Sequence, residues 1–549
     1  MPDKEPTYLQ IVKWIKLIFE WLIYIPFMII IYCVFQAFIH LRQILISIIY
    51  GSILAFIFLV FEYDNSVFFH QYETLLFFLY IMLWSAGTWF IFTLKEPDHE
   101  NVHGSAKFAD DDKINQLTKK SNGLLIGKDQ QGKKLLYYDG PGHLLTIAAS
   151  RSGKGVGSII PNLLKANRSI LCIDPKGENA NITSRTRANF GKVFTLDPFG
   201  VLGTDTASFN PLDSIDLTSD DYVEDVQSLA EALVFDSSPY AESESHWNEE
   251  AKALLSGVVL HILDAEPTYR KNLLTLREII TLPSQQFSEL LLTMQDSESC
   301  NGLIARCANR FLSKNDKEAS AVLSTLQRHT HFLDSPRMAK VLETSDFSFA
   351  DLKRQTQTIF LVIPPERISA FNRWLRSLVT QSLTEMAREK TKPNQPVLYL
   401  LDEFAALGRL EPVETAIGIM AGYDVQLWPI LQDIHQLKAH YGQMAGTFFS
   451  NAAVLQVFGI NDVETAKLVS DLSGQETRSY STRNHATGSG HDSYSQQLTG
   501  RPLLTPDEVR NLPQDEQLIF MTGLNPVRSK KIRYFSDQAF DGLFDESSI

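Results

Sequence analysis

The pattern of apolar residues divides the chain into two parts. Apolar runs at residues 21–39, 44–61 and 75–94 are each about long enough to cross a bilayer as a helix. Three long runs in succession are rare in soluble proteins and do not fit a cleaved signal peptide. The pattern therefore predicts a transmembrane region over residues 1–95, with two firm spans and a first run that either spans or lies along the interface.

The charges around these runs predict their orientation. Residues 62–74, between the second and third runs, contain no Lys or Arg, whereas the flanking segments carry Lys4, Lys13, Lys16, Arg42 and Lys95. Because Lys and Arg stay on the cytoplasmic side, residues 62–74 are expected outside the cytoplasm. The main body of the chain is expected inside.

After residue 95 the pattern changes to short apolar strands separated by helical stretches. Strand candidates are GLLIGKD, KLLYYD, HLLTIAA, SILCIDPKGE, KVFTLDPF, TIFLVIPPE, VLYLLDEF, VQLWPILQ, VLQVFGI and QLIFMTG. Strands that alternate with helices predict an α/β fold with a mainly parallel, doubly wound sheet.

Two segments interrupt this alternation. Between residues 215 and 345 the strand signal stops, and a 3.6-residue period predicts an all-α insertion. This insertion holds 21 Asp and Glu against 11 Lys and Arg, which fits either a surface for a protein partner or a solvated helical face. Residues 474–500 are rich in Ser, Thr, Gly, His and Gln and predict a long mobile loop.

Composition narrows the class of protein. The 549 residues are 44% hydrophobic, enough for several domains with real cores. Cys33, Cys172, Cys300 and Cys307 show no metal-ligand spacing and no disulfide framework, which fits a reducing compartment. The net charge of −14 argues against a protein covered by a basic nucleic-acid-binding surface, although it allows a basic channel.

Residues 148–157, AASRSGKGVG, lie between a strand candidate and an amphipathic helix, the context of a phosphate-binding loop. Two positions depart from the pattern G-x-x-x-x-G-K-[ST]: Ala148 stands at the first Gly, and Gly155 replaces the hydroxyl residue that contacts Mg²⁺. The alternative is a Gly-rich turn. Lys154 is expected to reach the terminal phosphates. The residues expected to bind a nucleoside triphosphate are Ser150, Arg151, Ser152, Gly153, Lys154, Gly155 and Val156.

A second element lies far downstream. The run at residues 397–410, VLYLLDEFAALGRL, begins with a fully apolar strand that ends in Asp402 and Glu403. Open α/β sheets bind ligands at this edge. We expect Asp402 to hold Mg²⁺ and Glu403 to orient or deprotonate the attacking water. The alternative is an ordinary helix N-cap, which the upstream loop argues against.

Ten motifs follow one another in a characteristic order. They are GSAKFA, SRSGKGVGSIIPNLL, DPKGE at 174–178, LDPF at 196–199, FNPLD at 209–213, HWNEEAKALL, LLDEFAALGRL, LQDIHQL, RPLLTPDEVRNLP and KKIRYF. With these motifs the chain resembles, over nearly its full length, the coupling ATPases of type IV secretion, the TraG-type proteins of bacterial conjugation.

The resemblance implies a RecA-like P-loop NTPase domain made of residues 96–214 and 346–549, an all-α insertion domain at 215–345 and a membrane stem. It implies a homohexamer that uses ATP and Mg²⁺. Its cargo would be single-stranded DNA with an attached relaxase, or protein effectors, delivered to other type IV secretion components. The implied location is the bacterial inner membrane, multi-pass, with the main body cytoplasmic.

The resemblance also assigns further site residues. Gln432 matches a glutamine of the family and would sense the γ-phosphate or the attacking water, which makes Lys154, Asp402, Glu403 and Gln432 the catalytic set. A polar residue at a strand end is the alternative for Gln432. The segment IMAGYDVQ before it lacks the arginine finger of related motors. Arg409 is either its substitute, supplied across a subunit interface, or a surface arginine.

Two other functions compete with this interpretation. One is a substrate receptor in which ATP binding only stabilises a ring, against which the intact Glu403 argues. The other is a double-stranded DNA translocase of the FtsK type, which usually has a basic C-terminal domain. The acidic final segment DQAFDGLFDESSI does not match that expectation.

Overall fold

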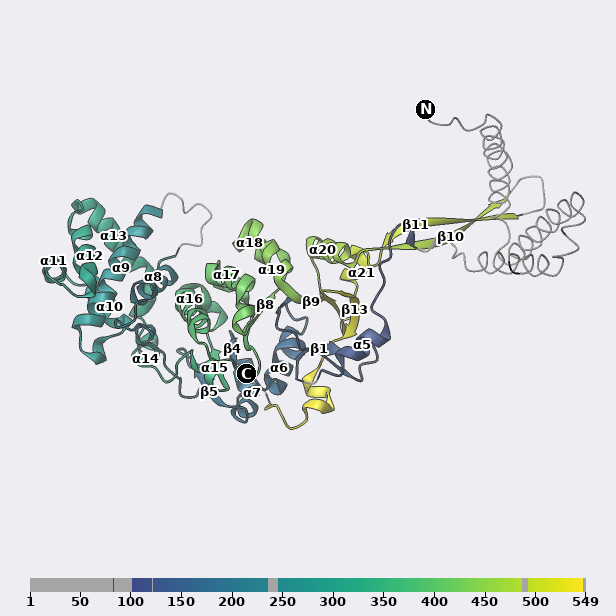
Figure 1. Ribbon diagram of the computed structural model, residues 1–549, viewed down its shortest axis with the longest axis horizontal. Coiled ribbons are helices and arrows are strands. Elements are labelled where there is room, and N and C mark those ends of the chain that lie inside the picture. Colours follow the sequence, from purple (N-terminus) through teal and green to yellow (C-terminus); the bar gives the residue numbers. More distant parts are fainter. Residues whose placement is uncertain (1–81, 83–100, 121, 236–244, 486–491, 547–549) are drawn as a thin grey trace, which may run out of the picture. The chain divides into compact units, whose positions relative to one another are not determined.

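The computed structural model describes residue 82 and residues 101–120, 122–235, 245–485 and 492–546. The chain divides into two compact units, residues 1–102 and 103–549. The second unit contains nearly all of the described residues (Figure 1).

The predicted membrane spans lie outside the described residues, apart from Met82. In the described part of the chain two helices are long enough to cross a bilayer, α9 (Ser245–Ala265, 21 residues) and α16 (Pro365–Arg388, 24 residues). They carry four and six charged side chains, and neither is apolar enough to span a membrane. The prediction of a multi-pass protein of the bacterial inner membrane is therefore corrected, because no described helix supports it.

A large mixed sheet forms the centre of the second unit. Its strands are β1 (Leu124–Lys128), β2 (Leu135–Tyr138), β3 (His143–Ala148), β4 (Ile170–Ile173), β5 (Lys192–Leu196), β6 (Gln357–Leu361), β7 (Val397–Leu401), β8 (Val425–Leu431), β9 (Ala452–Phe458), β12 (Glu516–Met521) and β13 (Leu524–Lys530). Their order is β2-β1-β13-β12-β9-β3-β8-β7-β4-β6-β5. The strands from β9 to β5 are parallel, whereas β12, β13, β1 and β2 pair antiparallel. The expected α/β fold is confirmed.

Helices cover both faces of the parallel part of the sheet. Successive side chains of a strand point to opposite faces, so each strand packs against both layers of helices. Cys172 of β4 shares an apolar cluster with residues of α6 (Ile160–Lys165) and α7 (Glu178–Ala188). Its neighbour Leu171 belongs to a second cluster with α16 and α17 (Glu411–Ile419) on the other face (Figure 1). Burial on both faces explains why these strands read as uninterrupted apolar runs.

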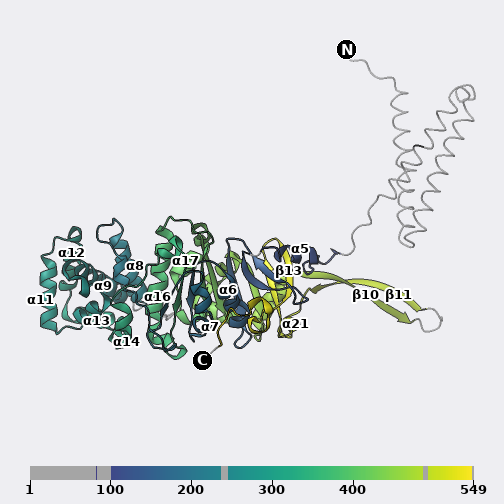
Figure 2. The same ribbon diagram turned by 90° about the horizontal axis from the view of Figure 1, so that it is seen from below.

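Between β5 and β6 the described residues contain helices and no strand. These helices are α8 (Tyr222–Leu233), α9, α10 (Leu273–Ile280), α11 (Ser284–Gln295), α12 (Leu303–Leu312), α13 (Asp316–His329), α14 (Pro336–Leu342) and α15 (Asp351–Arg354). Figure 2 shows α9, α11, α12 and α13 packed together. The remaining α-helices of the second unit are α5 (Asp111–Leu117), α18 (Ile434–Tyr441), α19 (Ala445–Asn451), α20 (Val463–Ser473) and α21 (Pro506–Arg510).

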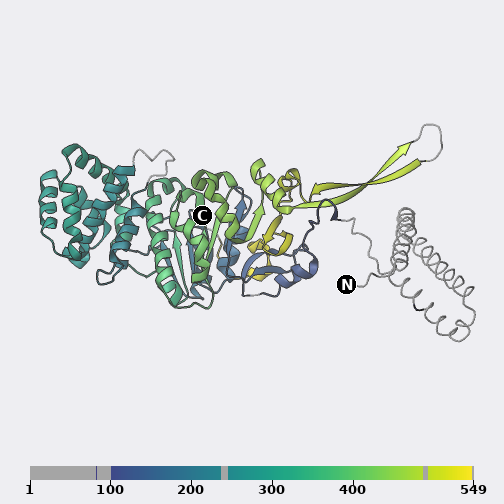
Figure 3. The same ribbon diagram turned by 45° about the horizontal axis from the view of Figure 1, so that its top comes forward.

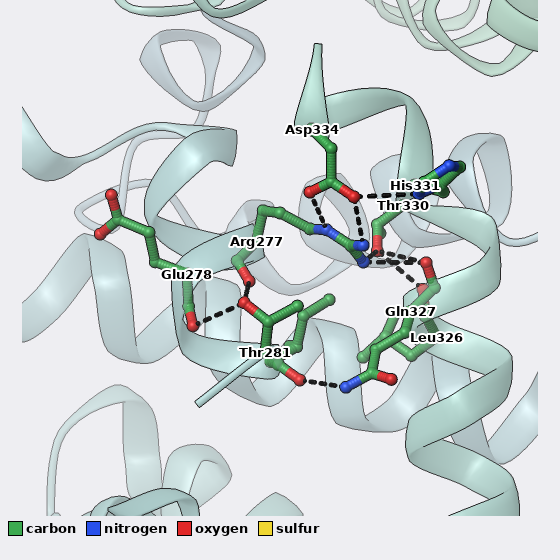
Figure 4. A network of polar contacts seen from close by, with 9 residues as sticks. Arg277, Glu278, Thr281, Leu326, Gln327, Thr330, His331 and Asp334 are labelled. Atoms are coloured by element: carbon green, nitrogen blue, oxygen red, sulfur yellow. Dashed lines mark hydrogen bonds and ion pairs between the residues drawn. The ribbon is translucent and has the colours of Figure 1, made fainter. Parts of the chain in front are cut away.

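Arg277 on α10 connects several parts of this helical segment (Figure 4). Its guanidinium donates to both carboxylate oxygens of Asp334, at 2.6 Å each, and to the Gln327 carbonyl at 2.9 Å. Gln327 in turn donates from its side-chain amide to the Ile280 carbonyl at 2.6 Å. Carbonyl groups at the ends of α10 and α13 thereby gain donors that the helices themselves cannot supply. The hydrogen bonds from Arg277 also hold the pKa of Asp334 below its usual value.

The predicted mobile loop at residues 474–500 is wrong. This segment contains most of an antiparallel hairpin, β10 (Gln475–His485) and β11 (Asp492–Pro502), paired in continuous register (Figure 3). Its described side chains are mostly exposed. Backbone hydrogen bonds rather than an apolar face define these strands, so the sequence carries no alternating apolar pattern that would predict them.

Arg277→Ala should loosen the helical segment and leave the sheet intact. The variant loses the ion pair with Asp334 and leaves the Gln327 carbonyl without this donor, which should lower the stability of the segment by about 1–3 kcal/mol. Arg306→Ala is the matched control, because Arg306 donates to the Asn301 carbonyl within one exposed turn. Hydrogen exchange in α10 and α13 measures the effect. Equal protection in the two variants would contradict this role of Arg277.

Candidate active site

The loop after β3 is a constrained turn. The carbonyl of Ala149 accepts hydrogen bonds from the N–H of Ser152 at 3.1 Å and from its hydroxyl at 2.6 Å. Arg151 and Gly153 have positive φ angles of 60° and 93°. Glycine tolerates this conformation, whereas a residue with a side chain seldom adopts it. The loop continues into a π-turn at Gly155–Ile159 and then into α6.

Lys154 extends from this loop to the end of β7. Its ammonium lies 2.7 Å from Glu403 Oε1 and 3.2 Å from Asp402 Oδ1. Glu403 has a positive φ of 50°, which turns the chain sharply after the strand, and its N–H donates to Asp402 Oδ1 at 3.0 Å. The side chains of Lys154 and Asp402 are each only 15% exposed, so water screens this contact weakly.

Burial and charge compete at this contact. Burial alone lowers the pKa of Lys154, but the charges and hydrogen bonds of Asp402 and Glu403 outweigh it and raise the pKa overall. Burial raises the pKa of Asp402, against the lowering effect of Lys154, and the Glu403 charge raises it further. A nearby cation favours the ionised form of such a carboxyl group. The site thus combines a charged ammonium suited to an anion with carboxylates suited to a cation.

Gln432 closes a chain of hydrogen bonds across the site. It follows β8, which lies between β3 and β7 in the sheet. Its side-chain amide donates to Glu403 Oε2 at 3.2 Å, and the hydroxyl of Ser150 donates to its side-chain oxygen at 3.0 Å. Gln432 therefore links the loop after β3 to the acidic end of β7.

Asp174 is a site residue that the sequence analysis did not single out. It follows β4, the neighbour of β7, and is 1% exposed. Burial raises its pKa to about 7, against hydrogen bonds from the N–H groups of Ala180 and Asn179, and the charges of Asp402 and Glu178 raise it further. The signal was present in the sequence, because Asp174, like Asp402, directly follows a buried apolar strand.

These groups line one cleft of about 770 Å³ at the carboxyl edge of the sheet. Among its lining residues are Ser150, Arg151, Gly153, Lys154, Gly155, Val156, Asp402, Glu403 and Gln432. Ser152 is not among them, and its side chain lies against Gly459 instead. Arg409 lies outside the lining and pairs with Glu411 at 3.6 Å and Glu414 at 3.3 Å.

Asp174→Asn should flatten the pH dependence of stability in the nucleotide-free protein. A raised carboxyl pKa contributes stability that is fully present below the ordinary value of 3.8 and is lost as pH rises through about 7. The wild type should lose on the order of 2–4 kcal/mol over that range, whereas Asn keeps the acceptor without the charge. Melting temperatures from about pH 4 to 8 measure the difference. Asp471→Asn, at an exposed position, is the control, and parallel curves for Asp174→Asn and wild type would exclude Asp174 as the source.

Comparison with known proteins identifies the family to which this chain is similar. Residues 104–547 match the family of type IV secretory system conjugative DNA transfer. The chain is similar to the conjugal transfer protein TraG of Escherichia coli, with 30% identity over 504 residues that cover 80% of this chain and 78% of that protein. It is also similar to protein VirD4 of Rhizobium radiobacter, with 28% identity over 473 residues that cover 83% of this chain and 67% of that protein.

Solved structures of the plasmid coupling protein TrwB share the fold. Its complex with the ATP analogue ADPNP has a TM-score of 0.60 and 17% identity, covering 78% of this chain and 93% of TrwB. Its complex with ADP and Mg²⁺ has a TM-score of 0.59 and 17% identity, covering 80% and 96%. This likeness establishes that the chain has the fold of TrwB. Since the family match spans most of the sequence and the TraG similarity most of both proteins, the chain belongs to the type IV secretory system conjugative DNA-transfer family.

Proposed function

We propose that this chain is the coupling ATPase of a type IV secretion or conjugation system. It hydrolyses ATP and uses the free energy to drive relaxase-bound single-stranded DNA, or protein effectors, toward the secretion channel. The contact of Lys154 with Asp402 and Glu403 is the observation that supports this most directly. It brings together, in one cleft, a cation for phosphate, a carboxylate for a metal ion and a base for water.

The cleft fits a nucleoside triphosphate with Mg²⁺. Its volume of about 770 Å³ lies in the usual range for ligand pockets. The N–H groups of the loop and the ammonium of Lys154 suit phosphate oxygens. The pKa of Asp402 is raised, so additional positive charge would stabilise its ionised form. Gly155 has no hydroxyl that could contact Mg²⁺. Asp402 is therefore the proposed ligand of Mg²⁺, which when bound neutralises charge on the transferring phosphoryl group.

Each catalytic residue has a separate proposed role. Lys154, which the two carboxylates hold, would turn its ammonium to the terminal phosphates. Glu403, whose second oxygen already accepts a hydrogen bond from Gln432, would accept the proton of the attacking water. Gln432 would keep Glu403 oriented. Through its hydrogen bond with Ser150 it would also couple the position of Glu403 to that of the loop.

We also propose the domain division and the assembly. Residues 96–214 and 346–549 would form the ATPase domain of a homohexameric ring, through which single-stranded DNA passes. Residues 215–345 would form a helical domain that receives cargo for the other secretion components. Leu292 on α11 is 53% exposed. Glu289, one turn earlier, and Asp296, the C-cap of α11, lie on the same helical face. An exposed apolar residue flanked by acidic ones supports a docking surface there.

Glu403→Gln should preserve nucleotide binding and abolish most hydrolysis. Glutamine can still accept a hydrogen bond from Lys154 but cannot accept the proton of water, so turnover should fall by about 10²–10⁴-fold. Lys154→Ala is the contrasting variant and should weaken binding itself, because it removes the phosphate contact. ATPase rates and titration with a fluorescent ATP analogue separate the two effects. Normal turnover in Glu403→Gln would exclude Glu403 as the base.

Reversing charge on α11 should weaken cargo capture and leave ATP hydrolysis unchanged. Substituting surface residues is preferable to deleting residues 215–345. The helix α8, which lies in that segment, shares one apolar cluster with α16, and a deletion would expose the buried face of α16. The double variant Glu289→Lys with Asp296→Lys is compared with a matched pair on α5, Asp111→Lys with Asp112→Lys, whose side chains are also exposed. Pull-down of a relaxase or effector measures capture. Equal capture by both double variants would place cargo recognition elsewhere.

A further inference from the structure

A lysine near the C-terminal end of the sheet contacts the phosphate-binding loop. Lys531 directly follows β13, and its ammonium donates to the carbonyl of Ser152 at 2.6 Å. The same ammonium lies 4.9 Å from the centre of the Phe458 ring. Lys531 belongs to the KKIRYF motif, for which the proposed mechanism has no role.

The surrounding structure fixes the position of Lys531. Its backbone N–H donates to the Asp515 carbonyl at 2.8 Å. The next residue, Ile532, is 1% exposed and shares an apolar cluster with Ile160 on the helix after the loop. A Cβ atom on Gly157 would lie 3.3 Å from the Ile532 carbonyl oxygen, so the chain after β13 approaches the start of that helix closely.

The hydrogen bond from Lys531 sets the orientation of one peptide group. In a trans peptide the C=O and the following N–H point in opposite directions. A donor that holds the Ser152 carbonyl therefore turns the Gly153 N–H to the other side of the loop. Gly153 lines the cleft and Ser152 does not, which indicates that this other side is the cleft. The positive φ of Gly153, 93°, allows the turn.

We infer that Lys531 is a positioning residue for nucleotide binding: it holds the loop with the Gly153 amide presented to a phosphate group. The inference rests on the proposed function of the cleft. It assigns Lys531 to affinity and not to the chemical step, because its ammonium contacts the loop backbone, whereas that of Lys154 contacts the carboxylates. Burial lowers the pKa of the Lys531 ammonium, and the charge of Arg533 lowers it further, whereas that of Asp515 raises it. The phosphate contact itself remains with the loop and Lys154.

Lys531→Met tests the inference in the full-length protein. We expect weaker binding of a fluorescent ATP analogue and a higher KM for ATP, each by about tenfold, as for the loss of one charge-assisted hydrogen bond. The value of kcat should stay unchanged. Lys530→Met is the matched control, since Lys530 pairs with Asp515 at 2.6 Å and Glu516 at 3.0 Å, and it should bind ATP like the wild type. Lys531→Arg should restore most of the affinity.

Hydrogen exchange in the nucleotide-free protein separates this inference from the proposed function. Lys531→Met should speed the exchange of the amides of residues 150–157, with an unchanged melting temperature. Lys531→Gln, which keeps a neutral donor, should show a smaller effect and serves the same comparison if the Met variant does not fold. Unchanged exchange with unchanged KM would overturn the positioning role, as would a lower kcat at constant KM. If the wild type bound no ATP, the proposed function would fail, while the exchange rates would still decide whether Lys531 orders the loop.

Discussion

A largely buried ammonium between two carboxylates fixes the geometry of the cleft. Lys154 and Glu403 are 249 positions apart in the sequence, and they meet because parallel strands end at one edge of the sheet. Lys154 and Asp402 are mostly removed from water, so removing one partner would leave the others with uncompensated charge. The contact therefore joins the loop after β3 to the acidic end of β7 and holds the two at a fixed spacing.

The sheet order and a buried polar network support that contact. β3, β8, β7 and β4 are neighbours, and each contributes a site element at its carboxyl end. Below the loop, the Gln456 side-chain oxygen accepts hydrogen bonds from Thr146 at 2.9 Å and from Ser158 at 3.2 Å. The Gln456 amide donates to the Ile126 carbonyl at 2.8 Å. A satisfied network of this kind orders its members, and it fastens the π-turn after the loop to β3, β9 and β1.

The strands that carry the site were predictable from sequence because they are buried on both faces, and a polar residue after such a run marks the ligand-binding edge. By that criterion Asp174 could have been assigned together with Asp402. The strand β13 could not be predicted from its sequence. Val527 and Ser529 are its only fully buried residues, and Asn and Pro interrupt its apolar pattern. The role of Lys531 was equally out of reach, because its contact with Ser152, 379 positions away, depends on the antiparallel part of the sheet. The site strands follow from local hydrophobicity, whereas the contacts that orient the loop follow from tertiary pairing.

The helix α16 offers a physical route from the cleft to the helical segment. Ile368, near its start, lines the cleft, and Arg388, at its end, pairs with Asp225 of α8 at 2.5 Å. Between these points Trp374 belongs to the same apolar cluster as Leu229 of α8. A helix of 24 residues is about 36 Å long, and a densely packed helix transmits displacement instead of absorbing it. A shift of the first turn of α16 at the cleft would therefore reach α8 without an intervening hinge. In the proposed coupling ATPase, this stiff connection would carry a change at the cleft to the helical segment that is proposed to receive cargo.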